Sequence, residues 1–259
     1  LKCIAECYLK MGNPEKAINS FKHYLDSNSR DYPCWNQFGL LYLDMEEYRN
    51  ALNAFEKARF GMSDNSEIYV NLGIAHMNLE NTDEAMESFE KALKLDEKAY
   101  KAWFHMGVIN YDVLIKRPLG MECWEKAIAI EPSFYQAWQR IGKHYQVRGD
   151  EHKAIQCFKK SVEFAPQEAL AWLGQARAYH ILKKHSMAIN AYKSYLKLIP
   201  TDTKIWEQIG KCYYEILDFE MMIDAYKKAY QGKDDLAYEW ETLGALMEKR
   251  QANKNAAEC

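Results

Sequence analysis

Residues 135–166 read YQAWQRIGKHYQVRGDEHKAIQCFKKSVEFAP. Apolar side chains recur every three or four positions on both sides of Gly149-Asp150, which is the period of an α-helix. Glycine is suited to ending a helix, and aspartate is suited to capping the start of the next one. The stretch therefore predicts two helices, over 135–148 and 151–164, joined by a tight turn.

The same pattern recurs along the whole chain. Tryptophans mark it at Trp35, Trp103, Trp138, Trp172, Trp206 and Trp240, with separations of 68, 35, 34, 34 and 34 residues. Tyr69 fills the first gap. Four positions after each of these aromatic residues stands a small one: Gly39, Gly73, Gly107, Gly142, Ala176, Gly210 and Gly244. A fixed period of this length is typical of a repeat array.

The unit boundaries follow when the aromatic residue is numbered as the fourth of each unit. A second aromatic residue then falls at position 24, and small residues fall at positions 8, 20 and 27, where close helix packing needs them. The predicted array has a partial unit over 1–31, units over 32–65, 66–99, 100–134, 135–168, 169–202 and 203–236, and a terminal helix over 237–259. Because the chain begins without Met inside a unit, we expect it to be a piece of a longer array.

One unit departs from the period. The unit over 100–134 needs one extra residue before Gly120 to stay in register. We place that residue in the inter-helix segment, residues 114–120. It is either an ordinary insertion in a surface loop or a protruding contact that a partner recognises.

The recurring motif resembles the tetratricopeptide repeat, W-x2-(L/I/M)-G-x2-Y followed by A-x3-F-x2-A and a proline near position 32. A well-matched copy contains Trp138, Ile141, Gly142, Tyr145, Ala154, Phe158 and Pro166. The resemblance implies an all-α fold: a right-handed α-solenoid, or superhelix, of about seven helix-turn-helix units plus a C-terminal helix. It also implies that the first helices line a concave groove. Since one helix pair cannot bury its own apolar face, stacked neighbours must form the core.

Composition excludes several classes of protein. Hydrophobic residues make up 48% and charged residues 27%, which favours a packed core over disorder. No run approaches the roughly 20 apolar residues of a membrane span, and a net charge of -3 argues against nucleic-acid binding. We therefore expect neither a membrane nor a nucleic-acid partner.

Motifs for catalysis, cofactors and metals are missing. The chain has no HExxH, G-x-S-x-G or P-loop motif, and no histidine–cysteine pair has the spacing of metal ligands. We expect no catalytic residue, no cofactor and no metal. Seven scattered cysteines without a CxxC pair favour a reducing compartment. We expect the cytoplasm, with a nuclear or ciliary location as the alternative.

The resemblance also implies that position 6 of each first helix contacts ligands. Gln37, Asn71, His105 and Arg140 stand at this position, so a partial ladder of hydrogen-bonding side chains spans four units. The alternative is a solvated polar lining. The subclass that grips chaperone carboxylates is not expected, because acidic residues, Glu6 and Glu67, replace its asparagine and lysine.

Charge is unevenly distributed. Residues 1–134 carry a net charge of -6, residues 135–215 carry +6, and residues 216–259 carry -3. In the basic segment, position 9 of three successive units is Lys143, Arg177 and Lys211, with Arg140 and Lys204 beside them. We predict a basic ridge that attracts an acidic, extended peptide. The alternative is a solvated ridge paired with Glu207 and other acids.

The predicted function is a non-catalytic protein–protein interaction scaffold. It would hold a partner peptide or helix in the concave groove, within a larger multi-subunit assembly. Two alternatives stay open: the substrate-recognition domain of a larger enzyme such as a glycosyltransferase, and a purely architectural spacer. The sequence does not decide whether the chain self-associates.

Overall fold

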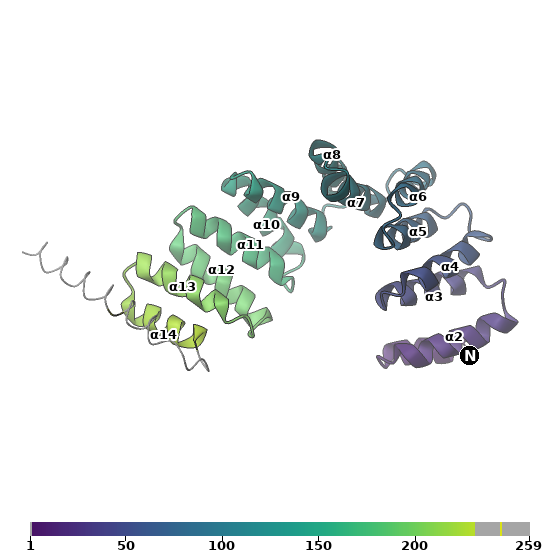
Figure 1. The fold of residues 1–259 in the computed structure, drawn as a ribbon, viewed down its shortest axis with the longest axis horizontal. Helices are drawn as coiled ribbons and strands as arrows, with labels where there is room; N and C mark the ends of the chain where they lie inside the picture. Colours follow the sequence, from purple (N-terminus) through teal and green to yellow (C-terminus); the bar gives the residue numbers. More distant parts are fainter. Residues whose placement is uncertain (1, 231–243, 245–259) are drawn as a thin grey trace, which may run out of the picture. The chain divides into compact units, whose positions relative to one another are not determined.

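The computed structural model describes residues 2–230 and Gly244, so the predicted terminal helix over 237–259 lies outside the described residues. The described part consists of α-helices and one short π-helix, η1, without a β-strand (Figure 1). The predicted all-α solenoid of helix-turn-helix units is confirmed. No helix in the described part is long and apolar enough to cross a membrane.

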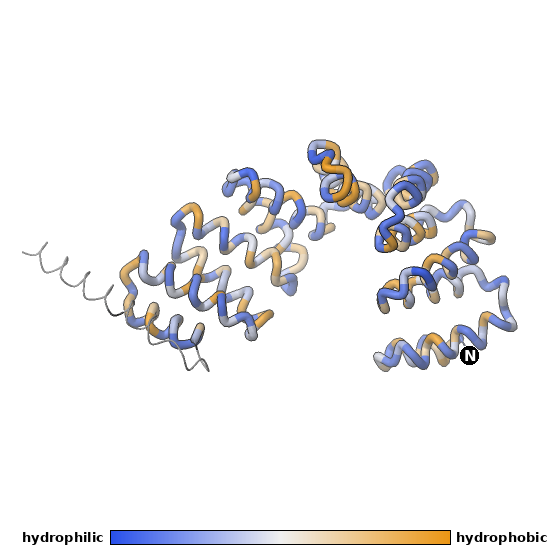
Figure 2. Tube along the Cα trace, viewed as in Figure 1, coloured by the Kyte–Doolittle hydropathy of each residue, from blue (hydrophilic) through white to orange (hydrophobic). Residues whose placement is uncertain are grey.

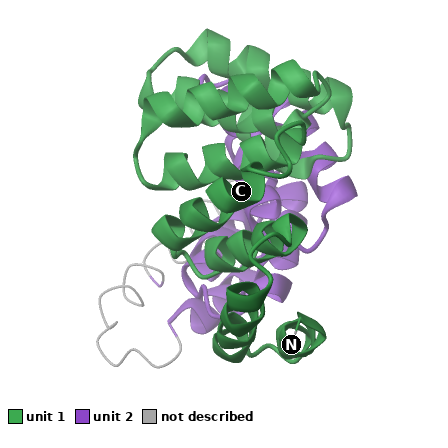
Figure 3. Cartoon of the chain, turned by 90° about the vertical axis from the view of Figure 1, so that its right-hand side faces the viewer, with its two compact units in different colours: residues 1–141 green, residues 142–259 purple. Residues whose placement is uncertain are grey.

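The chain divides into two compact units, residues 1–141 and residues 142–259 (Figure 3). Unit 1 contains α1 (Lys2–Lys10), α2 (Pro14–Ser27), α3 (Tyr32–Asp44), α4 (Tyr48–Arg59), α5 (Ser66–Asn78), α6 (Thr82–Leu95), α7 (Tyr100–Val108), η1 (Ile109–Val113) and α8 (Arg117–Ile130). Helix α9 (Tyr135–Val147) crosses the boundary. Unit 2 continues with α10 (Glu151–Phe164), α11 (Ala169–Ile181), α12 (His185–Leu198), α13 (Lys204–Glu215) and α14 (Phe219–Ala229).

The turns that join the two helices of each repeat share one backbone conformation. The middle residue of each turn has a positive φ, at Gly12, Glu46, Glu80, Ile115, Gly149, Lys183 and Leu217. Only two of these seven are glycine, the residue that adopts this conformation without strain. The turn predicted at 149–150 is present: Gly149 has a φ of 76°, and the carboxylate of Asp150 accepts a hydrogen bond from the Lys153 amide at 3.2 Å.

The core of unit 1 is built from the aromatic residues at position 24. Phe21, Phe55 and Phe89 are fully buried, and so is Trp124. Each of the last three fills space left by the glycine at position 8 of its own unit; a Cβ atom built on Gly73 would lie 2.5 Å from the Phe89 ring. The apolar residues recur along each helix as short bands between polar ones (Figure 2).

Unit 2 repeats this packing. Tyr192 and Phe158 are buried, and Gly142 and Gly210 lie against the aromatic rings of Phe158 and Tyr226. The aromatic ring at position 24, on the second helix of the repeat, thus fits because the glycine at position 8 of the first helix has no side chain. Because cores are close-packed, each glycine of this kind fixes how near the two helices of a repeat approach.

The tryptophans at position 4 are half-buried and have a second role. The indole nitrogens of Trp35, Trp138 and Trp172 donate hydrogen bonds to the carbonyl oxygen six residues earlier, each at 2.9 Å. Trp103 makes the equivalent bond at 3.2 Å. These bonds tie the start of each repeat to the turn that precedes it, and each contributes about 1 kcal/mol to stability.

The extra residue of the 100–134 unit lies in a helix, which corrects the predicted loop insertion. The turn after η1 has three residues, 114–116, as many as the turn after α5, residues 79–81. The additional residue is absorbed where α7 continues as the π-helix η1. Each hydrogen bond of a π-helix spans one more residue than that of an α-helix, so the insertion widens the helix and leaves the turn unchanged.

Candidate functional site

Gln37 is exposed on α3 and lines a groove of unit 1. The groove has a volume of about 420 Å³ and is formed by residues of α1, α2 and α3. Its walls include Leu9 and Leu40, which are 38% and 37% exposed, and its rim carries Glu6, Lys10 and Asp44. Gln37 therefore offers its amide beside exposed apolar surface.

Asn71 is buried on α5, where only 5% of the residue is exposed. Its amide nitrogen donates a hydrogen bond to the side-chain oxygen of Asn36 on α3, at 3.1 Å. This bond joins two successive repeats. In this conformation the Asn71 amide stabilises the stacking of α3 and α5.

His105 is half-buried on α7 and held between aromatic rings. It stacks on Phe89 with a centroid distance of 5.6 Å and meets the edge of Phe104 at 5.1 Å. Burial lowers the pKa of His105 to about 4, and the positive charges of Lys101 and Arg140 add to this effect. The ring is therefore neutral at pH 7. Its Nδ1 atom is buried without a hydrogen-bond partner in the described residues.

Arg140 lies on α9 in unit 1 and is already paired. Its guanidinium forms a salt bridge with the carboxylate of Asp112 in η1, with an Nη1–Oδ2 distance of 2.8 Å. It also lies 6.0 Å from the centre of the Trp124 ring. The four predicted ladder residues thus differ: one is exposed, two have intramolecular partners, and one has an unpartnered ring nitrogen.

The other predicted site residues belong to unit 2, and each lies on the first helix of a repeat. Lys143 is on α9, Arg177 is on α11, and Lys204 and Lys211 are on α13; all four are exposed. Within the described residues of unit 2, none of the four forms an ion pair. Among the described residues, Glu207 forms no ion pair with these cations.

Two of these cations, Arg177 and Lys211, act on polar side chains of α11 and α12. Burial raises the pKa of Tyr192 to about 12, and the nearby Arg177 opposes this rise. Burial and the neighbouring His185 lower the pKa of His180, and Lys211 lowers it further. The two cations thus influence the pKa values of side chains on two neighbouring helices, α11 and α12.

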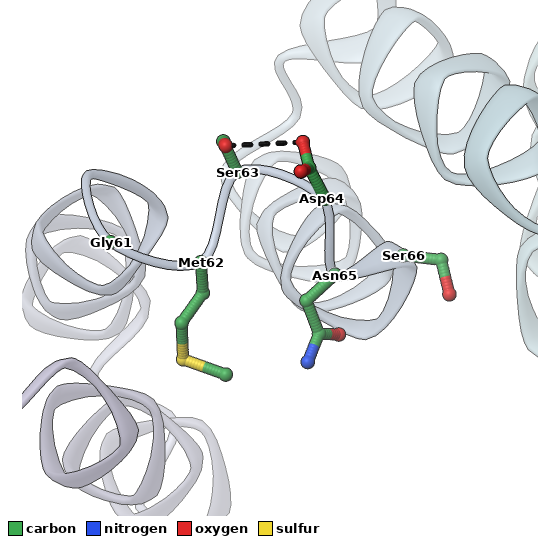
Figure 4. Close-up of a pocket in the computed structure, with 6 residues that line it drawn as sticks. All are labelled: Gly61, Met62, Ser63, Asp64, Asn65 and Ser66. Carbon is green, nitrogen blue, oxygen red and sulfur yellow. Dashed lines mark hydrogen bonds between the residues drawn. The ribbon is translucent and has the colours of Figure 1, made fainter.

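Another surface hollow of unit 1 lies away from these residues. It has a volume of about 510 Å³ and is lined by residues 61–66, in the turn between α4 and α5 (Figure 4). Its Ser63 hydroxyl donates to the Asp64 carboxylate at 3.2 Å. One short turn supplies the whole lining, and none of the predicted binding residues belongs to it.

Comparison with known families assigns the repeats. Two models described as tetratricopeptide repeat match residues 66–98 and 123–203. The chain belongs to the tetratricopeptide repeat family. A third model, described as anaphase-promoting complex, cyclosome, subunit 3, matches residues 1–58 of this tetratricopeptide repeat chain. A search of curated protein sequences returned no match.

Solved structures of similar fold include tetratricopeptide repeat proteins from different systems. A crystal structure of MamA is 25% identical over 64% of this chain and 96% of its own, with a TM-score of 0.53. Pseudomonas aeruginosa pilF is 16% identical, with 83% and 96% of the two chains covered and a TM-score of 0.66. The APC/C hetero-tetramer Cut9-Hcn1 is 16% identical, with a TM-score of 0.64; the match covers 93% of this chain and 47% of that one.

Proposed function

We propose that this tetratricopeptide repeat chain is a non-catalytic scaffold, and that unit 2 holds an acidic, extended segment of a partner protein. One observation carries the proposal: Lys143, Arg177, Lys204 and Lys211 are exposed and lack an ion-pair partner in the described part of unit 2. We call these four residues the basic ridge.

The physical argument is one of uncompensated charge. Like charges that recur at the same helical position raise the local potential and attract an acidic ligand. Some basic residues of the chain are compensated: Arg140 is paired with Asp112, and Lys160 is paired with Glu163. The four ridge residues differ from the remaining unpaired cations in lying on the first helices of successive repeats. A ligand that carries carboxylates at a similar repeat would supply the missing partners.

The solved structures of similar fold support the proposal that this scaffold acts within a multi-subunit assembly. One of them is an APC/C hetero-tetramer, and another, PilW, is a type IV pilus biogenesis factor. The six described cysteines are free, which fits a reducing compartment such as the cytoplasm. We therefore propose a cytoplasmic scaffold whose partners are proteins.

The test uses a labelled peptide of alternating glutamate and serine as the probe, and its glutamine counterpart as a neutral control. Fluorescence anisotropy across a salt series measures both affinities. We expect the glutamate peptide to bind more tightly and to lose affinity as salt rises. The triple variant Lys143→Glu, Arg177→Glu, Lys211→Glu should abolish that preference.

A matched triple variant controls for net charge. Lys159→Glu, Lys184→Glu and Lys197→Glu change the charge by the same amount at exposed lysines outside the first helices. This variant should bind the glutamate peptide nearly as well as the parent does. Equal affinity for the two peptides, or equal losses in both triple variants, would refute the basic ridge as the site.

A further inference from the structure

Three potential metal ligands converge in unit 2, outside the basic ridge. His180 lies near the end of α11, His185 is the first residue of α12, and Cys212 lies in the middle of α13. One ligand atom from each of the three lies within 4.8 Å of the other two. The two imidazole rings meet edge to face, with centroids 5.8 Å apart.

The separation of these atoms is close to what a metal ion needs. With zinc–nitrogen bonds of about 2.0 Å and zinc–sulfur bonds of about 2.3 Å, tetrahedral ligand atoms lie roughly 3.3–3.6 Å apart. Small rotations of three side chains therefore suffice to close the cluster on an ion. Two imidazoles and a thiolate form a ligand set that suits zinc, a borderline-soft cation.

One polar atom of the cluster has no hydrogen-bond partner among the described residues. The Nδ1 atom of His185 is buried and has no hydrogen-bond partner in the described residues. Leaving a buried ring nitrogen unsatisfied costs free energy, which a bound ion would recover. Cys212 is fully buried, so its thiol is shielded from solvent.

The surrounding charges partly cancel. Glu215, one turn after Cys212 on α13, lies close enough to act on both His180 and Cys212. Its negative charge favours a cation, whereas Lys211 acts on His180 in the opposite sense. A cation bound here would receive three ligands from the protein and leave a fourth coordination position for water.

We propose that His180, His185 and Cys212 form a binding site for a divalent transition-metal ion, with zinc as the preferred ion. The Cys212 thiol would lose its proton to solvent on binding, and the thiolate sulfur would bond to the metal. Because the ligands come from three consecutive helices, the ion would cross-link two successive repeats, those of α11–α12 and α13–α14.

The experiment titrates Co²⁺, and then Zn²⁺, into the full chain with a non-thiol reductant and without oxygen. Cobalt reports thiolate ligation through a charge-transfer band in the near ultraviolet and four-coordinate geometry through intense visible bands. We expect both to saturate at one equivalent, to disappear on addition of Zn²⁺, and to be absent in Cys212→Ala. His185→Ala should weaken cobalt binding at least about tenfold, since even the loss of an outer-sphere partner costs that much.

Matched variants identify the thiol. Cys157→Ala removes another buried cysteine of unit 2, and the pKa of both thiols is raised to about 11, mainly by burial. This variant should keep the cobalt spectrum. So should Cys3→Ala combined with Cys7→Ala, which removes two exposed thiols on α1.

Folding is checked by far-ultraviolet circular dichroism for every variant. Zinc should raise the melting temperature of the parent and of Cys157→Ala, but not that of His185→Ala. A thiolate band that persists in Cys212→Ala, or that vanishes with Cys3 and Cys7, would overturn the proposal. A parent chain that shows no thiolate band would also overturn the proposal. If Cys212→Ala does not fold, the weakened cobalt binding expected of His185→Ala becomes the deciding test.

Discussion

The ring of Phe158 packs against Gly174, which belongs to the following repeat. A Cβ atom built on Gly174 would lie 2.5 Å from the Cζ atom of Phe158, closer than the 3.0 Å found for Gly142 in the same repeat as Phe158. Phe158 therefore packs against α9 of its own repeat and also against α11 of the following repeat, where α11 approaches α10. The tighter of its two glycine contacts is the one between repeats.

Gly174→Ala should therefore destabilise the chain more than Gly142→Ala does. The methyl group at position 174 must displace a buried ring, for which we expect a cost of about 1–3 kcal/mol, partly offset by the better helix propensity of alanine. At position 142 the gain in helix propensity is the same, but the contact with the ring is looser, so the steric cost is smaller. The gain and the cost should therefore nearly cancel. Urea unfolding of both variants measures the difference, and equal free energies of unfolding would contradict this packing.

A second prediction concerns the turn after η1. Ile115 has a φ of 55°, a conformation that costs a β-branched residue roughly 1–2 kcal/mol. Because 64% of the residue is exposed, Ile115→Gly removes the strain and loses little packing. We expect a net gain of about 0.5–1 kcal/mol after the entropic cost of glycine.

Gly149→Ala provides the reverse test. Gly149 occupies the equivalent place in its turn with a φ of 76°, and a Cβ atom there would meet nothing within 4 Å. Any loss is therefore a backbone effect, which we expect to be about 1 kcal/mol. Thermal unfolding of both variants should show shifts of opposite sign; two shifts of the same sign would rule out backbone strain as the cause.

Most of the fold could be predicted from the sequence because it is encoded in a period. The 34-residue spacing of Trp138, Trp172 and Trp206 locates the helix pairs without tertiary information, and the buried aromatic residues follow from position 24. The π-helix η1 could not be found in this way, since an extra residue in sequence does not reveal whether a helix or a turn absorbs it.

The candidate site was harder to predict because side-chain partners depend on neighbouring repeats. Position 6 marks Asn71 as a ligand contact, but not its hydrogen bond with Asn36 or its burial. The cluster of His180, His185 and Cys212 was missed for a related reason. Its members are 5 and 27 residues apart and meet only because three helices stack. Comparing repeat positions across adjacent units would have revealed it.

A third prediction concerns Asp31, the N-cap of α3. One oxygen of its carboxylate accepts a hydrogen bond from the Cys34 amide, and the other accepts from Tyr24 at 2.9 Å and from Lys2 at 3.1 Å. Burial opposes ionisation, but these bonds outweigh it and hold the pKa of Asp31 below its usual value. Asp31→Asn keeps a capping side chain and removes the charge, so we expect a loss of about 1–2 kcal/mol at pH 7.

The pH dependence of this loss has a definite sign. A carboxylate whose pKa is lowered in the folded state stabilises the fold above its unfolded pKa of about 4, and that stabilisation is lost as the pH falls through the folded pKa. The parent and Asp31→Asn should therefore converge in acid. Asp202→Asn is the matched control: Asp202 accepts a hydrogen bond from Tyr195 at 2.9 Å but forms no salt bridge in the described residues, so a smaller loss is expected.

The last prediction concerns His105, whose pKa is lowered to about 4 by burial, with Lys101 and Arg140 contributing. In the unfolded chain an imidazole titrates near pH 6.5. A histidine that stays neutral in the folded state stabilises the fold fully above that value, and its contribution is lost as the pH falls from 6.5 toward 4.

Because the unfolded chain takes up a proton on this imidazole that the folded state largely excludes, we expect a loss of about 2–3 kcal/mol in the free energy of unfolding between pH 7 and pH 4.5. Urea unfolding at pH 7 and pH 4.5 measures the total loss. The parent should lose more stability between these two conditions than His105→Phe, which keeps a ring against Phe89 but cannot take up a proton. In parallel, the NMR signals of the His105 ring should remain those of a neutral imidazole at pH 5.5. A His105 ring that titrates near pH 6.5, or an equal pH dependence of stability in parent and variant, would contradict the burial of this side chain.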